Sequence, residues 1–521
     1  MATIILGDAY TNLDAWPGDL LAATDGVTIG THTATNFTYT FNAGTKWSGY
    51  SVIATGTGFT YDGAEPLDGT LKGLKITNDL GQTVLQVTGI SGASYASDMG
   101  LFAAYQFGWT DPGGGGSNSQ LKNAWSLLFS GNDVVNGTEG DDGRGFVGVD
   151  AGNDIFNMGG GDDWVNGGLG NDTIHGGDGW DVLDYGETTW NEGIPMVRGI
   201  TIDVTAGTVK DPFGFVDTFT DIEEFHGSAT RDRFIGGADG KDFMGLRGAD
   251  VFIGGASGND WIVYHDDTWS GGGRGIVANL GVKSAPGKVF GTVQDGFGNI
   301  DKTTNIDNVS GTRYADRFTG NSHDNVFAGG EGKDSYRGGG GSDWVIFSWW
   351  FTDADQHGIS VDLRKTTGQI IDDGFGNKEN AISIENIRGG YQDDLIIGNA
   401  GNNVIRGDEG NDTMTGAGGA DEFNWSFISE NGGAELITDF QSGAGSDQDI
   451  LSFGLSHEGL STTLVLEIGT AVTSSLVGTF VFNPTTHMLS YDADGLGGND
   501  MVNIVTLAGV TTLSAANFDL Y

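Results

Sequence analysis

The chain has 521 residues, of which 70 are acidic and 24 are basic, and its formal net charge is −46. So strong a negative charge argues against binding to nucleic acid phosphates or to anionic lipid surfaces. The chain has no cysteine, which excludes a disulfide framework and a thiolate metal site. No run reaches the roughly 18 apolar residues of a membrane-spanning helix.

Glycine is the second unusual feature. It supplies 93 of the 521 residues, far above its ordinary share of roughly 7%. The chain nevertheless has only 7 Pro, and its 29 Phe, 13 Trp and 13 Tyr offer ample apolar surface for a core. This composition predicts a folded protein that needs unusual backbone freedom.

Residues 1–110 are predicted to form a small β-rich domain. Three of its segments alternate between apolar and polar residues as strands do, namely 35–42, 49–62 and 71–78. Residues 96–109 are expected to form a short helix capped by Ser97 or Asp98. The glycine-rich stretch that follows is a linker and lead-in, 111–127.

The aromatic residues of this first domain leave two interpretations open. They either pack into a sandwich core or line a glycan-binding surface; they are Phe37, Tyr39, Phe41, Trp47, Tyr50, Phe59 and Tyr61. The N-terminal segment has no basic residue before Lys46, so we expect no cleavable secretory signal there.

From residue 128 onwards a nine-residue phrase dominates the sequence. The stretch "GGLGNDTIH" (167–175) shows its form: glycines first, an aspartate sixth and an apolar residue eighth. The phrase recurs in four blocks, mostly at steps of nine. Its sixth-position residues are Asp133, Asp142, Asp154, Asp163, Asp172, Asp181, Asp232, Asp242, Asp250, Asp260, Asp316, Asn325, Asp334, Asp343, Asp394, Asn403, Asp412 and Asp421.

These sixth-position residues are predicted metal ligands. Glycines permit the positive φ angles of a tight turn, so carbonyl oxygens can point together beside the aspartate. An all-oxygen shell suits Ca²⁺, which takes six to eight oxygens in flexible geometry, better than Mg²⁺. Aspartates that only cap turns are the alternative, but turn capping does not require a period of nine. We expect weaker sites at Asn325 and Asn403, which lack the charge, and a frayed turn at Asp142, where Arg144 follows.

The three residues after each sixth position are predicted to form a short strand whose apolar middle residue points inward. Stacked turns would then wind into a parallel β-roll. The phrases "GGLGNDTIH", "GADGKDFMG", "GGEGKDSYR" and "GDEGNDTMT" resemble the RTX (repeats-in-toxin) family. This resemblance implies an all-β fold of tandem RTX β-roll blocks, several bound Ca²⁺ ions and export by type I secretion machinery.

A longer period is superimposed on the short one. The first three blocks are each followed by a strand-rich excursion, and the spacings from Asp181 to Asp260 and from Asp260 to Asp343 are 79 and 83 residues. Strands are expected at 199–204, 275–280 and 358–363. The resulting organisation is block 1 at 128–185, followed by three regions that each hold an excursion and a block, at 186–264, 265–347 and 348–424.

Residues 425–521 are predicted to cap the roll with further strands. Asp439, Asp447 and Asp449 are additional candidate ligands, and the group Asp492, Asp494 and Asp500 is either a plain turn or a calcium site. The last residues, "LSAANFDLY", resemble the C-terminal type I secretion signal of RTX proteins.

No catalytic residues are predicted. The stretch "HEGLS" (457–461) lacks the second histidine of a zinc protease, and no G-x-S-x-G elbow is present. A glycosidase needs only two carboxylates, but most acids here already belong to turns. We therefore expect a non-enzymatic protein, secreted from a Gram-negative bacterium and associated with the cell surface.

The expected role is structural or adhesive, as a surface layer, filament or biofilm matrix. Its partners would be further copies of the chain or a cell-surface or matrix polysaccharide, without nucleic acid or a membrane span. The alternative function is that of a glycan-binding adhesin that acts through the N-terminal domain. The third candidate function is that of an RTX-type extracellular hydrolase.

Overall fold

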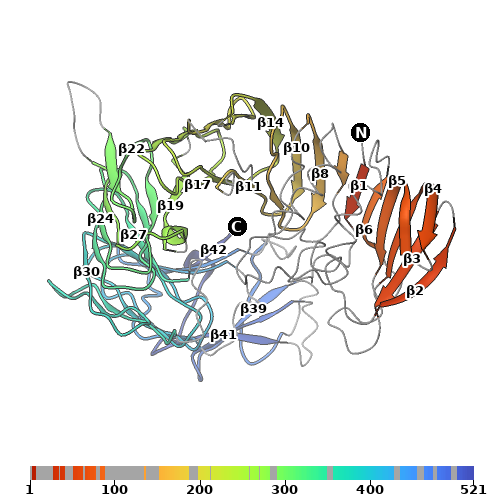
Figure 1. Ribbon diagram of the computed structural model, residues 1–521. Coiled ribbons are helices and arrows are strands. Elements are labelled where there is room, and N and C mark those ends of the chain that lie inside the picture. Colours follow the sequence, from red (N-terminus) through yellow and green to blue (C-terminus); the bar gives the residue numbers. More distant parts are fainter. Residues whose placement is uncertain are drawn as a thin grey trace. The chain divides into compact units, whose positions relative to one another are not determined.

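The computed structural model describes residues 3–6, 27–33, 36–41, 51–62, 65–77, 83–88, 134–136, 152–186, 198–211, 213–256, 258–268, 270–281, 290–348, 356–426, 435–454, 463–472, 478–493 and 501–521. These residues form strands and two short 3₁₀ helices, η4 (His265–Asp267) and η6 (Ala515–Asn517), but no α-helix. In this described part no helix is long and apolar enough to cross a membrane. The fold is all-β, as predicted (Figure 1). The chain divides into two units, Met1–Ser257 and Gly258–Tyr521.

Unit 1 begins with an antiparallel sheet. Its strands are β1 (Thr3–Leu6), β2 (Val27–His32), β3 (Asn36–Phe41), β4 (Ser51–Asp62), β5 (Glu65–Thr77) and β6 (Thr83–Thr88). The order is β2–β3–β4–β5–β6–β1, and β1 also pairs in parallel with β7 (Val134–Asn136). The three predicted strands are thus confirmed as β3, β4 and β5. The predicted helix at 96–109, the linker and the side chains of the seven candidate aromatics lie outside what the structure describes.

The nonapeptides of unit 1 form a two-sided roll. Its strands are β8 (Ile155–Gly160), β9 (Trp164–Val165), β10 (Thr173–Asp178), β11 (Val182–Asp184), β16 (Arg233–Ile235), β17 (Asp242–Met244) and β18 (Val251–Ile253). Strand β10 pairs in parallel with β8, whereas β11 pairs with β9 on the other side. Two nonapeptides therefore make one coil of 18 residues. The eighth-position residues Phe156, Val165, Ile174 and Leu183 are fully buried between the two sides.

Unit 2 repeats this arrangement. Its roll strands are β19 (Trp261–Val263), β23 (Asn308–Ser310), β24 (Arg317–Thr319), β25 (Val326–Ala328), β26 (Ser335–Arg337), β27 (Trp344–Ile346), β31 (Asn386–Arg388), β32 (Leu395–Ile397), β33 (Val404–Arg406), β34 (Thr413–Thr415) and β35 (Glu422–Trp425). Successive coils stack their core aromatics: the Phe318 and Tyr336 rings lie 5.2 Å apart and nearly parallel. Such stacking fixes the register of neighbouring coils.

Each excursion is a three-stranded meander inserted into one side of the roll. In unit 1 these are β12 (Thr201–Asp203), β13 (Thr208–Lys210) and β14 (Val216–Thr220), with β14 parallel to β10 and β12 parallel to β16. The other side gains a single strand, β15 (Glu224–His226), between β11 and β17. Two extra strands therefore add about 10 Å of sheet width to one side at the excursion.

Unit 2 contains the corresponding meanders. They are β20 (Val277–Asn279), β21 (Gly291–Gln294) and β22 (Ile300–Thr304), then β28 (Ser360–Asp362), β29 (Ile370–Asp372) and β30 (Asn380–Ile382). The strands predicted at 199–204, 275–280 and 358–363 are confirmed as β12, β20 and β28. Each meander returns to the roll through a left-handed corner residue before an isoleucine, namely Asp221, Asn305 or Ser383, with φ of 54°, 55° and 52°.

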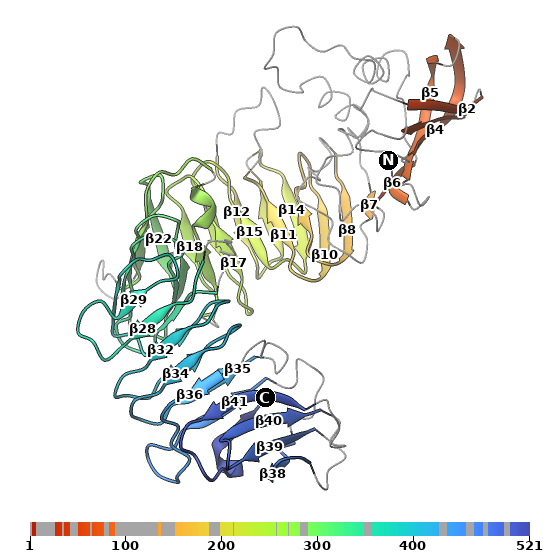
Figure 2. The same cartoon turned by 90° about the horizontal axis from the view of Figure 1, so that it is seen from below.

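The C-terminal region continues the roll and closes it. Its strands are β36 (Glu435–Ile437), β37 (Ile450–Phe453), β38 (Leu466–Ile468), β39 (Thr479–Asn483), β40 (Met488–Asp492), β41 (Val502–Leu507) and β42 (Phe518–Leu520). Strand β41 pairs in parallel with β36 (Figure 2), and β42 pairs in parallel with β37. The tail that resembles a secretion signal therefore contributes the final roll strand. Asp492 is buried in β40, whereas Asp494 and Asp500 lie outside the described residues.

Candidate metal centre

The sixth-position carboxylates form a ladder along the roll. The backbone N–H of Asp154 donates to Oδ1 of Asp172 at 2.8 Å, and that of Asp163 donates to Oδ1 of Asp181 at 3.0 Å. The partners are 18 residues, or one coil, apart. The same bond joins Asp232 to Asp250, Asp316 to Asp334, Asn325 to Asp343, Asp394 to Asp412 and Asn403 to Asp421. The structure thus aligns the predicted ligands in two columns.

All the predicted ligands that the structure describes are buried, with at most 3% of their surface exposed. They are Asp154, Asp163, Asp172, Asp181, Asp232, Asp242, Asp250, Asp260, Asp316, Asn325, Asp334, Asp343, Asp394, Asn403, Asp412 and Asp421. Asp133 and Asp142 lie outside the described residues. The local strands therefore place these carboxylates inside the turns rather than on a solvated acidic surface.

In several phrases the first glycine makes room for the second carboxylate oxygen of the sixth residue. A Cβ on Gly338 would lie 2.1 Å from Oδ2 of Asp343, and a Cβ on Gly416 would lie 2.2 Å from Oδ2 of Asp421. Other turn glycines lie against carbonyl oxygens one coil earlier: a Cβ on Gly177 would be 2.0 Å from the oxygen of Gly159. Carboxylate and carbonyl oxygens therefore crowd together in these turns.

The second oxygen of several carboxylates lacks a hydrogen-bond donor. Oδ2 of Asp181 and Oδ2 of Asp343 are buried without a partner in the described part of the chain. Burial raises the pKa of Asp394 to about 8 and that of Asp421 to about 7, with neighbouring carboxylates adding to the effect. A buried acid of this kind must take up a proton or neighbour a cation.

The donor set fits a hard cation. Among the described residues no group of three acidic or histidine side chains is placed to hold a metal by itself. With one carboxylate per turn, backbone carbonyl oxygens must supply most of the coordination shell of the cation. The glycine-rich turns permit this because their carbonyl oxygens can point together. Such an all-oxygen, largely neutral shell suits Ca²⁺. The sixth-position aspartates would hold the ions, which would neutralise them and join successive coils.

The two asparagines behave differently from the aspartates. The Nδ2 group of Asn325 donates to the carbonyl of Asp307 at 2.9 Å, and that of Asn403 donates to the carbonyl of Glu385 at 2.6 Å. A carboxylate has no proton to donate in this way. The amide therefore satisfies a carbonyl of the preceding coil, and this supports the prediction of weaker sites at both positions.

The C-terminal candidates differ in placement. Asp449 continues the ladder, because its Oδ1 accepts the N–H of Asp421 at 3.0 Å. Asp439 instead accepts the N–H groups of Gly416 and Ala417. Asp447 is exposed and accepts a bond from the neighbouring Ser446 hydroxyl. Asp449 is the one of the three that the geometry places among the ladder carboxylates.

Sequence reasoning missed acids in the excursions. Oδ1 of Asp217 accepts the N–H of Asp172 at 3.0 Å, and Oε1 of Glu379 accepts that of Asp334 at 2.6 Å. On the opposite side Glu223 and Glu385 accept the N–H groups of Asp181 and Asp343. These acids lie outside any nonapeptide. The available signal was the spacing of six residues that separates 217 from 223 and 379 from 385.

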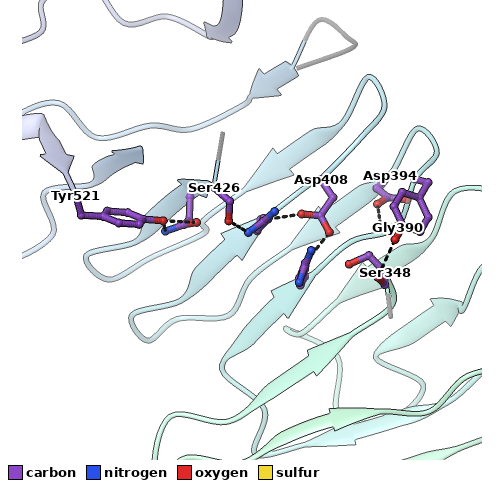
Figure 3. A network of polar contacts seen from close by, with 10 residues as sticks. Ser348, Gly390, Asp394, Asp408, Ser426 and Tyr521 are labelled. Atoms are coloured by element: carbon purple, nitrogen blue, oxygen red, sulfur yellow. Dashed lines mark hydrogen bonds and ion pairs between the residues drawn. The ribbon is translucent and has the colours of Figure 1, made fainter. Parts of the chain in front are cut away.

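A second set of contacts ties the coils of unit 2 together without metal (Figure 3). Asp408 lies between two guanidinium groups, with Arg388 Nε at 2.6 Å from Oδ2 and Arg406 Nε on Oδ1. Arg406 also donates to the Ser426 hydroxyl, while the Tyr521 hydroxyl pairs with Asn424. Part of the coil-to-coil attachment is thus independent of the carboxylate columns.

The same figure shows a tie where the third excursion rejoins the roll. The Tyr391 hydroxyl donates to the carbonyl of Ser348 at 3.1 Å, and the N–H of Gly390 donates to Oδ2 of Asp394 at 2.7 Å (Figure 3). One ladder carboxylate is therefore held by the chain segment that re-enters the roll.

One histidine, His226, lies among acidic side chains that are not adjacent to it in sequence or that lie on its own strand. Nε2 of His226 lies 2.6 Å from Oε1 of Glu224, and its Nδ1 lies 3.7 Å from Oδ1 of Asp184. Trp164 and Trp180 donate to Asp184 and Glu224 through their indole N–H groups. Only 4% of His226 is exposed, so this cluster serves as an internal tie between strands.

The comparisons with known proteins agree with the turn geometry. The family model described as the RTX calcium-binding nonapeptide repeat matches four copies, at residues 129–142, 158–187, 310–345 and 388–423. No curated protein matches the chain. Block 2 lies outside these four matches, yet its Asp232–Asp250 bond and its strands repeat the same coil. The chain therefore carries RTX calcium-binding nonapeptide repeats in these four segments.

Proposed function

We propose that this protein leaves a Gram-negative bacterium by type I secretion, folds outside the cell on binding Ca²⁺, and acts as a structural or adhesive component of the cell surface. The observation that carries the proposal is the pair of buried carboxylate columns. Acids so close together repel one another, so the compact roll depends on bound cations. Where calcium is scarce the chain stays open, and where calcium is abundant it folds.

The distribution of charge supports assembly between copies. Besides the buried columns, the turns carry exposed acids such as Asp324 and Asp393, each with one oxygen bonded to the next coil. A surface of this kind repels a second copy unless divalent cations bridge the two. Calcium would then control both the folding of one chain and the association of several.

The test is electron microscopy of the purified full chain with calcium and after chelation. Ordered sheets or filaments that form with calcium and disperse in chelator are expected. A matched sample with magnesium in place of calcium controls for general charge screening. Dispersed single molecules at every calcium concentration would contradict the assembly role.

Two other functions predict different results with the same preparation. An adhesin would bind a surface or matrix polysaccharide in calcium without forming assemblies. A hydrolase would turn over glycan or ester substrates. Either result in the absence of ordered assemblies would replace the structural role.

A further inference from the structure

Six neighbouring strands of unit 2 share an outer face that carries no acid. Their order is β30–β26–β24–β20–β21–β22, and residues such as Ala278, Phe318 and Tyr336 are buried on their inner face. The residues on either side of these point outward, because side chains alternate between the two faces of a strand. On these six strands, all of which the structure describes, the outward residues are basic, aliphatic or uncharged polar, and none is acidic or aromatic.

Three exposed cations lie on this outer face, which we name the basic strip. They are Lys302 on β22, Arg317 on β24 and Arg337 on β26. Strand pairing places Lys302 and Arg337 in one row across the sheet and Arg317 in the neighbouring row. Within the described part of the chain none of the three side chains is paired with a carboxylate. Their charges are therefore available to a ligand.

The segments that lead into these strands add positive charge beside the basic strip. Arg274, Lys333 and Lys378 precede β20, β26 and β30 and are exposed. Glu331 lies in the same region, but it is bridged to Arg313 at 3.0 Å. In a chain with 70 acidic and 24 basic residues, this part of the surface has the opposite sign to the whole.

The matching faces of the other two excursions are mixed in charge. In the first excursion Lys210 and Arg233 share the outer face with Asp203. In the third excursion Asp362 of β28 is paired with Arg364, whose Nε lies 2.9 Å from Oδ1. A face without acids is therefore a property of the second excursion and not of the repeat as such.

The basic strip is long and narrow. With strands about 4.8 Å apart and residues about 3.3 Å apart, six strands of three residues span about 24 Å by 10 Å. This is about 240 Å², whereas each partner in a stable protein–protein interface buries roughly 800 Å². A linear polymer that runs across the strands fits such a surface better than a second folded copy of the chain does.

The chemistry of the basic strip favours carboxylate groups on that polymer. An arginine can donate two parallel N–H bonds to one carboxylate. At physiological ionic strength the screening length is about 8 Å, so distant acids of the chain act only weakly on a ligand bound here. The strip has no outward aromatic ring on which nucleic acid bases could stack, as they do in proteins that bind single strands. Charge and hydrogen bonds would therefore select the ligand.

We propose that the basic strip binds a linear acidic polysaccharide, with Arg317, Arg337 and Lys302 contacting its carboxylates. Val277 and Ile300, which are exposed in the same row as Arg317, would pack against the apolar faces of the sugar rings. This inference rests on the proposed role at the cell surface and names the partner and the place where it binds. Calcium is needed only to fold the roll that carries the strip.

The test measures binding of the full chain in calcium to hyaluronan, a linear polysaccharide with regularly spaced carboxylates, by biolayer interferometry. Wild-type protein is expected to bind, and more weakly as the salt concentration rises. The triple variant Lys302→Gln, Arg317→Gln and Arg337→Gln should bind roughly tenfold more weakly, because three exposed charge pairs are lost. Neutral dextran and duplex DNA serve as comparison ligands, and neither should match hyaluronan.

The matched control removes the same charge from the first excursion. The triple variant Lys210→Gln, Arg231→Gln and Arg233→Gln also replaces one exposed lysine and two exposed arginines, and it should bind hyaluronan as the wild type does. Far-UV circular dichroism in calcium checks that both variants are folded. If the strip variant fails to fold, Arg317→Gln alone decides, with an expected loss of about twofold.

Four results would overturn the proposal: no binding of hyaluronan by the wild type, full binding by the folded strip variant, equal loss in the control variant, or equal binding of dextran or DNA. Ordered assemblies in calcium without hyaluronan binding would remove the strip's ligand and leave the structural role standing. The absence of both assemblies and binding would remove the proposed function as well.

Discussion

Replacing Gly338 by alanine is expected to destabilise the calcium-bound protein by about 3 kcal/mol or more, at the upper end of overpacking effects. The new Cβ would lie 2.0 Å from the carbonyl oxygen of Ser383 and 2.1 Å from Oδ2 of Asp343. Both contacts are far inside van der Waals distance, so the carboxylate or the coil must shift. Urea denaturation in saturating calcium measures the change in the free energy of unfolding, and a calcium titration should show weaker binding.

Gly340 supplies the control within the same turn. A Cβ at this position would meet no atom within 4 Å. We therefore expect Gly340→Ala to change the stability by less than about 0.5 kcal/mol, as for ordinary surface substitutions. Equal stability of the two variants would show that the first-position glycine is not needed to seat the carboxylate.

Calcium-free protein is expected to lose structure as the pH rises from about 4 to about 8. Burial raises the pKa of Asp172 and that of Asp394 to about 8, from the ordinary 3.8 of an aspartate. Between these limits the folded state binds more protons than the unfolded state, so the free energy of unfolding falls with increasing pH. Above pH 8 this stabilisation by protons is fully lost.

Calcium reverses this dependence. Protons compete with the cation for the same carboxylates, so the calcium concentration needed for folding should fall as the pH rises. Circular dichroism of protein freed of calcium on a chelating resin, recorded from pH 5 to pH 8 with and without added calcium, follows both trends. A metal-free protein that gains structure towards pH 8 would contradict the assignment of raised pKa values in the columns.

The repeat sequence was sufficient to predict the coil. The period of nine and the apolar eighth position fix where strands such as β10 and β11 begin and which side chains are buried. The side chain of the sixth-position aspartate must then lie inside the turn. The predicted roll and the burial of its sixth-position carboxylates therefore follow from local pattern alone.

The excursion acids that join the carboxylate ladder did not follow from the same pattern. Glu379 stands 45 residues after its partner Asp334 and carries no glycine phrase, so a search by period passes over it. The contact of Glu379 with Asp334 depends on how the β28–β30 meander returns to the coil. Packing between residues that are distant in sequence determines that return. The same holds for the contact of His226 with Asp184, which lies on the neighbouring strand β11, whereas its other partner Glu224 lies on the same strand β15.

The sequence also did not predict that the C-terminal tail would pair with the roll as its last strand. Residues 513–521 resemble an export signal, and nothing in them specifies a partner strand. Packing supplies it: Phe518 stacks near Phe453 and Phe480, with ring centroids 6.4 and 5.2 Å away. Burial of these rings explains why the tail becomes strand β42 in the folded protein.

The most direct test of the central claim is a calcium titration of the purified chain at neutral pH, followed by far-UV circular dichroism. We expect little ordered β-structure after complete removal of calcium and a cooperative gain of it as calcium is added, with magnesium much less effective. The same spectrum and the same urea midpoint with and without calcium would contradict it.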